Sequence, residues 1–282
     1  MTRVLSGIVL VLIAVAVVGW APRWVIFLVL VVLSNLALHE FYQLSEKCGL
    51  MPFRSAGHLY ALWLLAEQWV FPQHVSMGAL TGFVLLVLAL SLTDAGSFPR
   101  AIGSSGATIL GTLYTGGFLS LLLAWPDSSS SSGTIHSPFD SRASIFFLLA
   151  VVWASDIGAY YVGRGIGKRK LAPRISPGKT IEGLVGGLIA SVLVSLVFHR
   201  YWLRGYSLGA VVALAIILDL AGVLGDLAES AMKRGAGVKD SSSIVPGHGG
   251  VLDRIDSLLF AIPVMYYYPS LLAFLKSIIK IA

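Results

Sequence analysis

The sequence predicts an all-α polytopic membrane protein with about nine transmembrane helices. Hydrophobic residues make up 56% of the 282-residue chain and charged residues only 12%, whereas a soluble domain is usually about 45–50% apolar. Apolar runs of about 20 residues, the length that crosses a bilayer as a helix, also recur along the chain. Cys48 is the only cysteine, so an internal disulfide is excluded and nothing indicates an oxidising compartment.

Nine apolar spans are expected, with edges good to a few residues. They are 4–20, 24–39, 57–71, 76–92, 106–125, 143–162, 181–199, 207–228 and 257–279. The third is short and contains Glu67, so a re-entrant or tilted course is expected for it. The first has only Arg3 before it and is followed at once by another span, which favours a retained helix over a signal peptide.

Lysine and arginine set the predicted orientation. With nine spans, 14 of these residues fall on one side of the membrane and 6 on the other, and the richer side is normally cytoplasmic. The polar loops 163–180 and 229–256 both lie on that side. We therefore expect residues 1–142 to form about five N-terminal transmembrane helices. Residues 143–282 would form a catalytic transmembrane region of about four helices, with a polar active-site cavity opening to the cytoplasm.

The loop 163–180 contains six lysines or arginines and no acid. Its glycines and prolines exclude one long helix. The cations could serve only as a topology anchor. Alternatively, Pro177–Thr180 leads into a helix from Ile181, whose free backbone N–H groups would bind a phosphate beside Lys179. This turn is not a P-loop, because the pattern G-x-x-x-x-G-K-[ST] is absent.

The segment 226–256 holds five carboxylates, four lysines or arginines and one histidine in an otherwise apolar region. A charge at membrane depth is costly unless it is paired, hydrated or metal-bound, so this cluster predicts a working site. Helical spacing puts Asp219, Asp226 and Ser230 on one stripe. We expect Asp219, near the bilayer midplane, to be a neutral acid hydrogen-bonded between helices. Asp226, near the cytoplasmic mouth, is expected to bind a cation.

The run Pro246–Gly250 cannot form a regular helix, and its glycines would let the backbone approach a ligand. Asp253 and Asp256 follow at the start of the ninth span, where acids also stabilise a helix N-terminus. Asp226 and Asp253 would meet if the eighth and ninth spans form a hairpin. Carboxylates with a single nearby histidine suit magnesium better than zinc. Asp156, beside small residues in the sixth span, either packs between helices or belongs to the polar pocket, which we favour.

Residues 230–256 resemble the C-terminal motif of phosphatidate cytidylyltransferases, also called CDP-diacylglycerol synthases. The motif positions are filled here by Ser230, Met232, Lys233, Arg234, Lys239, Asp240, His248, Gly249, Gly250, Val251, Asp253, Arg254, Ile255 and Asp256. The stretches SDIGAYYVGR, LAPRISPGKTIEGLVGG and GDLAES also look like this family, so the resemblance covers about the C-terminal half, from residue 150. Val245 and Ile157 depart from the residues usual in the family, and Ile157 removes a hydroxyl beside Asp156.

The resemblance implies that CTP and phosphatidate react to give CDP-diacylglycerol and pyrophosphate, with magnesium and with room for potassium as a second cation. A lipid phosphate oxygen would attack the α-phosphorus of CTP in line. On this basis the catalytic residues are Asp226, Asp253, Asp256 and Lys239, and the first two bind the metal. The expected substrate-binding residues are Asp156, Lys168, Arg174, Ser176, Lys179, Thr180, Glu182, Glu229, Ser230, Lys233, Arg234, Asp240, His248, Gly249, Gly250 and Arg254.

Another class of function remains open. An ion- or proton-coupled membrane transporter would also carry acids inside its spans, although the paired broken helices typical of such proteins are not evident. An enzyme acting on CTP and phosphatidate is expected in the bacterial inner (plasma) membrane, with its active site facing the cytoplasm. No nucleic-acid partner is expected, and a homodimer is left open.

Overall fold

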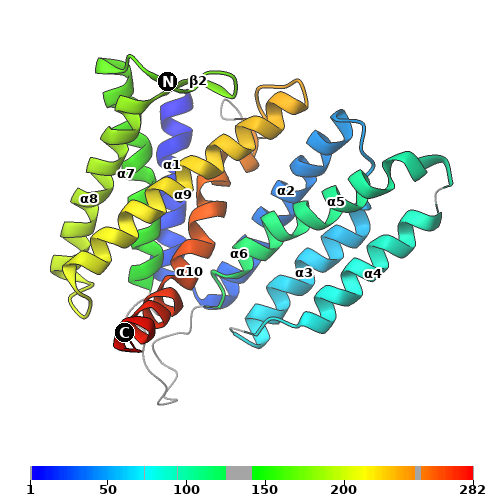
Figure 1. The fold of residues 1–282 in the computed structure, drawn as a ribbon, viewed down its shortest axis with the longest axis horizontal. Coiled ribbons are helices and arrows are strands. Elements are labelled where there is room, and N and C mark those ends of the chain that lie inside the picture. The colour runs from blue at the N-terminus through cyan, green and yellow to red at the C-terminus, as the bar shows by residue number, and fades with distance from the viewer. Residues whose placement is uncertain (1, 73, 94, 125–141, 245–248, 282) are drawn as a thin grey trace. The chain divides into compact units, whose positions relative to one another are not determined.

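The computed structural model describes residues 2–72, 74–93, 95–124, 142–244 and 249–281. Most of these residues form helices, and the only strands among them make one two-stranded sheet, which confirms the all-α class (Figure 1). The chain divides into two compact units. The first consists of Met1–Trp125 and Met232–Ile255, and the second of Pro126–Ala231 and Asp256–Ala282. The sequence did not indicate this division. The predicted division at residue 142 concerns membrane spans and catalysis, and it stays a prediction.

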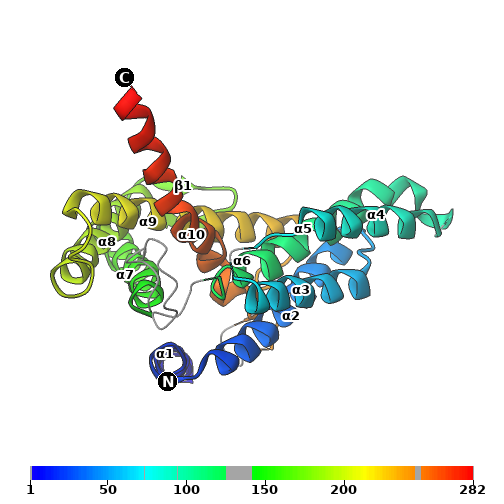
Figure 2. The same cartoon turned by 90° about the horizontal axis from the view of Figure 1, so that it is seen from below.

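The first unit is built mainly from the N-terminal helices. These elements are α1 (Thr2–Trp20), α2 (Arg23–Lys47), α3 (Arg54–Val70), α4 (Met77–Thr93), the 3₁₀ helix η1 (Ala95–Arg100), α5 (Ala101–Thr112), the π-helical turn η2 (Leu113–Gly117) and α6 (Phe118–Ser120). Helices α2, α3, α4 and α5 lie side by side in both views (Figures 1 and 2). The fifth span was predicted over residues 106–125. The helix there begins earlier, at Ala101, and is interrupted by the π turn Leu113–Gly117.

Buried aromatic side chains hold these helices together. Tyr42 of α2 is fully buried, and its hydroxyl lies 3.2 Å from the Thr108 carbonyl oxygen and 3.0 Å from Thr112 Oγ1 on α5. The rings of Tyr60 and Phe83 stack at 4.0 Å between α3 and α4. Aromatic pairs of this kind add to the stabilisation that comes from burial alone. The first unit thus has a core of its own.

Glu67, the acid inside the short third span, is satisfied within the first unit. Its side chain is 6% exposed and its Oε1 atom lies 3.0 Å from His74 Nδ1. The same oxygen accepts a hydrogen bond of 2.9 Å from the Ser76 backbone N–H. Helix α3 is continuous from Arg54 to Val70, so this acid does not interrupt it. A tilted or re-entrant course of this span stays a prediction.

The second unit contains most of the remaining elements. They are α7 (Arg142–Ile166), β1 (Lys170–Ala172), β2 (Ser176–Thr180), α8 (Ile181–Tyr201), α9 (Leu208–Gly235) as far as Ala231, and α10 (Leu252–Ile281) from Asp256 onward. Helices α7 and α8 pack along their length through glycines. A methyl group on Gly158 would lie 2.6 Å from the Gly186 carbonyl oxygen, and one on Gly183 would lie 2.9 Å from the Ala159 carbonyl oxygen. Only glycine lets the two backbones approach so closely.

Helices α9 and α10 run antiparallel within the second unit. A methyl group on Gly225 would lie 2.5 Å from the Asp256 carbonyl oxygen. At the other end of the contact, the Tyr268 hydroxyl donates a hydrogen bond of 2.7 Å to the Ala210 carbonyl oxygen. The eighth and ninth predicted spans therefore pair as a hairpin does.

The protein is a multi-pass membrane protein by the length and composition of its helices. Among the described residues, five helices are long and apolar enough to cross a membrane: Arg23–Lys47, Arg142–Ile166, Ile181–Tyr201, Leu208–Gly235 and Leu252–Leu272. Two shorter apolar helices are Val11–Trp20 and Met77–Thr93. Large apolar side chains such as Leu193 on α8 and Leu224 on α9 are exposed, which suits helices that face lipid.

Candidate active site

The cationic loop 163–180 folds as a short antiparallel hairpin. Strands β1 and β2 pair Lys170 with Thr180 and Ala172 with Ser176. The glycines and prolines of the loop exclude a long helix, as predicted, but the sequence did not indicate strands. Because β2 ends where α8 begins, the hairpin delivers Lys179 directly to the start of a membrane helix.

The first turn of α8 is closed by its own neighbours. Thr180 is the N-cap, and its Oγ1 accepts a hydrogen bond of 3.0 Å from the Gly183 N–H. The Glu182 carboxylate accepts hydrogen bonds from the backbone N–H groups of Lys168, at 3.0 Å, and Arg169, at 3.1 Å. Thr180 and Glu182, both predicted to bind substrate, thus fasten the hairpin to the helix. A role in substrate binding stays a prediction for both.

Lys179 and Asp226 form an ion pair between the hairpin and α9. The Lys179 Nζ atom lies 2.8 Å from Asp226 Oδ2, and the two side chains are 25% and 31% exposed. The Ser230 hydroxyl, one turn further along α9, donates a hydrogen bond of 3.2 Å to Asp226 Oδ1. Since the pair is partly exposed, its carboxylate oxygens are accessible to an incoming cation.

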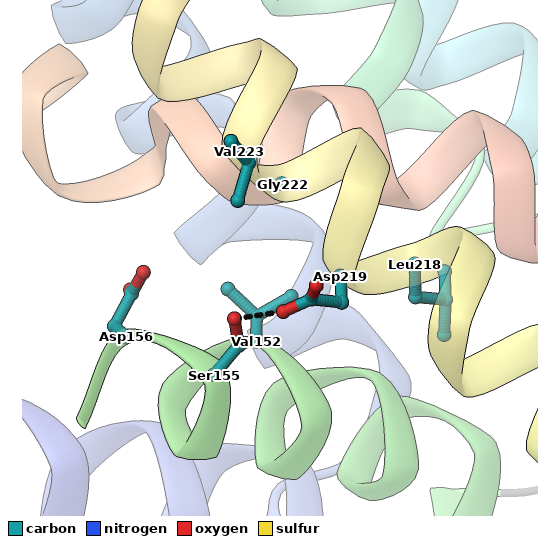
Figure 3. A pocket seen from close by; sticks show the side chains of 7 residues that line it. All are labelled: Val152, Ser155, Asp156, Leu218, Asp219, Gly222 and Val223. Carbon is teal, nitrogen blue, oxygen red and sulfur yellow. Dashed lines mark hydrogen bonds between the residues drawn. The ribbon is translucent and has the colours of Figure 1, made fainter. Parts of the chain in front are cut away.

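Asp219 lies deeper in the second unit. The residue is only 1% exposed. Its Oδ1 atom accepts hydrogen bonds from the Ser155 hydroxyl and, at 3.3 Å, from the Ser191 hydroxyl. Figure 3 shows Ser155 of α7 and Asp219 of α9 pointing toward one another. Asp219 Oδ2 is buried without a hydrogen-bond partner in the described part of the chain. The predicted hydrogen bonding of Asp219 between helices is therefore present.

A pocket lies beside Asp219 in the second unit (Figure 3). It is lined by Val152, Ser155, Asp156, Leu218, Asp219, Gly222 and Val223. Asp156 is exposed and lies within range of the charges of Asp226, Lys179 and Asp219. The second unit therefore gathers three acids and one lysine from α7, α9 and the hairpin into one electrostatic group.

Asp256 lies where α10 packs against α9, next to the turn of α9 that carries Asp226. Its carbonyl oxygen faces Gly225, the residue before Asp226. A methyl group on Gly225 would lie 2.5 Å from that oxygen, so this glycine lets the start of α10 approach the Asp226 turn of α9. A catalytic role for Asp256 stays a prediction.

Asp253 lies in the first unit, where its carboxylate contacts a lysine, a serine hydroxyl and two backbone N–H groups. Its Oδ1 atom lies 2.5 Å from Lys233 Nζ, and its side chain is 6% exposed. Oδ2 accepts hydrogen bonds from the Ser241 N–H at 3.0 Å, the Ser241 hydroxyl at 2.9 Å and the Gly250 N–H at 2.8 Å. Asp253 thus fills the helix N-terminus role that the sequence allowed. Its binding of a metal stays a prediction.

The two glycines before α10 differ in what they require. Gly249 has a φ of +79°, a left-handed conformation that favours glycine. A methyl group on Gly250 would lie 2.7 Å from Glu40 Cδ. The backbone therefore approaches a carboxylate of the protein itself. The expected close approach to a ligand stays a prediction. His248 lies outside the described residues.

The remaining predicted site residues fall into three groups by exposure. Those at the surface are Lys168, Arg174, Arg234, Lys239, Asp240 and Arg254, those partly or nearly fully buried are Ser176 and Lys233, and Glu229 is 0% exposed. The exposed cations suit contact with a polyanion in solution. Glu229 is an integral part of the packed helix α9 instead.

Glu40 of α2 contacts the motif-bearing part of the chain, and the sequence did not reveal this. It is 0% exposed, and four donors from residues 241–242 and 251–252 surround its carboxylate. Oε2 accepts from the Ser241 hydroxyl at 2.8 Å and the Leu252 N–H at 2.7 Å. Oε1 accepts from the Ser242 hydroxyl at 2.6 Å and the Val251 N–H at 2.9 Å. The one available signal was an acid directly after the apolar span 24–39.

The donor set determines which metal the site can hold. Within the described ranges, no group of three or more His, Cys, Asp or Glu side chains is arranged to hold an ion. Magnesium is often bound through only one or two carboxylates, with waters and substrate phosphates completing its shell. Asp226, with the Ser230 hydroxyl on it and part of its side chain exposed, fits that mode.

Comparison with known proteins then identifies the family. The model of the cytidylyltransferase family matches residues 1–272. The chain belongs to this family. The match begins at residue 1, so the cytidylyltransferase resemblance extends well beyond the C-terminal half in which the motifs lie.

Curated relatives agree with this assignment. The chain is 34% identical to a phosphatidate cytidylyltransferase of Haemophilus influenzae, over 94% of this chain and 97% of the relative. It is 32% identical to a phosphatidate cytidylyltransferase of Synechocystis, over 96% of each chain. A third, from Staphylococcus saprophyticus, is 52% identical over 43% of this chain and 46% of its own length. A membrane transporter finds no support in these comparisons.

Proposed function

We propose that the protein transfers the cytidylyl group of CTP to phosphatidate, giving CDP-diacylglycerol and pyrophosphate. The family match over residues 1–272 carries this proposal. Relatives named phosphatidate cytidylyltransferase, similar along almost the whole chain, support the choice of substrates. The second unit also brings together Asp156, Asp219, Asp226 and Lys179, and charged groups of this kind suit substrates that carry phosphates.

The reaction needs no protein nucleophile. An oxygen of the phosphatidate phosphate attacks the α-phosphorus of CTP, the new P–O bond forms, and the bond to the departing pyrophosphate breaks in line. Catalysis then depends on holding the two phosphates in position and neutralising their charge. Lys179, on the hairpin before α8, is the described lysine best placed to contact a phosphate beside Asp226. The exposed cations Lys168 and Arg174 of the same unit would extend this positive surface. A role for Lys239 is proposed from the sequence alone.

Magnesium is the metal we assign to this site. Bound magnesium would offset the charge of the triphosphate, and Asp226 would hold it with the nearby Ser230 hydroxyl as a polar neighbour. The sharing of that ion with Asp253 is proposed from the sequence alone, as is a second, monovalent cation such as potassium. A lysine already contacts each of these carboxylates, so magnesium binding would make both ammonium groups available to phosphates.

The membrane arrangement is also proposed in detail. Five long apolar helices and bacterial relatives support a multi-pass protein. We propose nine spans in the bacterial inner membrane, a polar cavity open to the cytoplasm, and cytoplasmic loops 163–180 and 229–256. A homodimer is compatible with this arrangement.

Incubation of the purified protein with labelled CTP tests the proposed reaction. Pyrophosphate release and labelled CDP-diacylglycerol should require CTP, phosphatidate and magnesium together. Replacing magnesium by a chelator, or phosphatidate by diacylglycerol, should abolish both products, because the metal and the attacking phosphate are then missing. Equal pyrophosphate release without phosphatidate would make the protein a nucleotidase and contradict the proposal.

A further inference from the structure

Glu40 joins the N-terminal helices to the motif segment, by which we mean residues 241–244 and 249–253. We propose that it is a positioning residue for the reaction: it holds these residues so that the Asp253 carboxylate keeps the position and orientation that the reaction needs. The inference rests on the proposed function, because the position of Asp253 matters for activity only if the protein catalyses that reaction. All the residues concerned belong to the first unit.

The setting of Glu40 is unusual for a carboxylate. It lies in an apolar helix and is 0% exposed, where an unsatisfied charge would be strongly unfavourable. Four donors at 2.6–2.9 Å meet its two oxygens. Two of the donors are the Val251 and Leu252 N–H groups, at the start of α10. A helix start leaves such N–H groups without partners inside the helix, so Glu40 caps α10 from another part of the chain.

Ser241 transmits the position of Glu40 to Asp253. Its hydroxyl lies 2.8 Å from Glu40 Oε2 and 2.9 Å from Asp253 Oδ2. Ser241 is 1% exposed, so it has little freedom to move away. Since its N–H also donates to Asp253, the carboxylate of Asp253 is oriented by a residue that Glu40 holds in place.

Gly250 adds a second connection between the two acids. A methyl group there would clash first with Ser241 Oγ and then with the Glu40 carboxylate, whose Cδ atom would be 2.7 Å away, so any side chain would displace both residues. With glycine, the backbone packs directly on the Glu40 carboxylate while its N–H donates to Asp253 at 2.8 Å. Gly250 is thus explained by Ser241 together with Glu40, which lies about 200 residues earlier in the sequence.

The first unit offers a matched control for Glu40. Glu67 of α3 is also a nearly buried acid that accepts from a side chain and a backbone N–H. Its partners, His74 and Ser76, belong to the α3–α4 connection and not to the motif segment. A loss of activity that follows only from losing a buried acid would therefore appear in both positions.

Glu40→Gln and Glu67→Gln should be compared in the purified full-length protein. Glutamine keeps the size of Glu40 but places an NH₂ group against two donors. We expect kcat to fall and the magnesium concentration for half-maximal activity to rise, each about 10–100-fold, as for residues that orient metal ligands. The KM for phosphatidate should change little. Glu67→Gln should leave kcat and the magnesium requirement within about threefold, a change below ~1 kcal/mol.

Hydrogen exchange supplies a readout that does not depend on activity. Glu40→Gln should accelerate exchange of the amides of residues 249–253, and Glu67→Gln should not. If the wild-type protein makes no CDP-diacylglycerol, the proposed function fails, while exchange still reports whether Glu40 holds the segment. Faster exchange with normal kcat and a normal magnesium requirement would overturn the positioning role. Unchanged exchange would overturn the inference at its structural basis.

Ser242→Ala keeps the inference testable if Glu40→Gln does not fold. This variant removes the 2.6 Å donor to Glu40 Oε1 without altering either acid. It should shift the magnesium requirement and the exchange of residues 249–253 in the same direction as Glu40→Gln, by a smaller factor. Wild-type behaviour of Ser242→Ala in both measurements would contradict the role assigned to Glu40.

Discussion

Each of the two acids assigned to magnesium contacts a lysine. Lys179 pairs with Asp226 at 2.8 Å and Lys233 pairs with Asp253 at 2.5 Å. Partners of this kind lower the cost of keeping a carboxylate ionised near an apolar region. The two pairs differ in exposure, since Asp226 is 31% exposed and Asp253 only 6%. Asp226 is therefore the more accessible of the two carboxylates.

Asp226→Asn and Asp253→Asn test whether the two acids bind one ion. Each variant should lower kcat by about 10²–10³-fold, because a charge that offsets the triphosphate is lost. The double variant should fall little further if both residues act as one unit. Steady-state kinetics over a range of magnesium concentrations measure this. Losses that multiply in the double variant, or a normal magnesium dependence in either single variant, would show that they do not share an ion.

Asp219→Asn should retain most of the activity. Asparagine is isosteric and keeps the carbonyl oxygen that accepts from Ser155 and Ser191, and Asp219 is too deeply buried to meet a metal–triphosphate complex without desolvating it. We expect kcat to fall less than about tenfold, or ~1.4 kcal/mol in the barrier. The measurement is kcat of the folded variant. Complete loss of activity would move Asp219 into the catalytic group.

Single residues were predictable only where their partners are near in sequence. Asp226 and Ser230 are four residues apart on α9, so helical spacing alone placed them on one face. Glu40 could not be found in this way, because its partners follow 201 to 212 residues later. The Lys179–Asp226 pair has the same difficulty, since it depends on how a hairpin meets a helix.

At the scale of elements, the helices were more predictable than the turns between them. Apolar runs of helical length placed the cores of α2, α7, α8, α9 and α10. The β1–β2 hairpin was not predicted, because glycine and proline exclude a helix without specifying what replaces it. The π turn of η2 was not predicted either, and it lies where α3 packs closely against it. A methyl group on Gly116 would lie 2.7 Å from Ala61 Cβ of α3.

The contact between α7 and α8 gives a prediction about packing. Gly158→Ala would place a methyl group 2.6 Å from the Gly186 carbonyl oxygen. Overpacking of this kind should lower the free energy of unfolding by about 1–3 kcal/mol. Gly165→Ala, on the same helix and with nothing within 4 Å in the described structure, is the matched control. Unfolding in detergent measures both. Equal stability of the two variants would show that the contact can relax.

At the scale of the whole molecule, the membrane orientation is the main prediction. The division of lysine and arginine into 14 and 6 predicts that position 170 faces the cytoplasm and position 130 the outside. In intact cells, a thiol reagent that cannot cross the membrane should label a cysteine introduced at position 130 but not one introduced at position 170. Cys48 is exposed and would react itself, so the background must be Cys48→Ser. Labelling of position 170 from outside would overturn the predicted topology.

The division into two units is the part of the whole molecule that the sequence did not indicate. Hydropathy reports which segments are apolar, but it does not report which of them pack together. Residues 232–255 belong to the first unit although their flanking residues on α9 and α10 belong to the second. Within the first unit, Glu40 bonds residues 241 and 252 across about 200 positions of sequence, and no local pattern reveals such contacts.

The hydrogen bonds of Glu40 predict how a truncated form of the protein would behave. The recognisable motifs lie from residue 150 onward, so a gene fragment that encodes only this half would look sufficient for catalysis. Its product would nevertheless lack the acceptor for two serine hydroxyls and two backbone N–H groups before α10. Activity should return only when the N-terminal fragment is co-expressed. The catalytic signature is thus encoded near both ends of the gene.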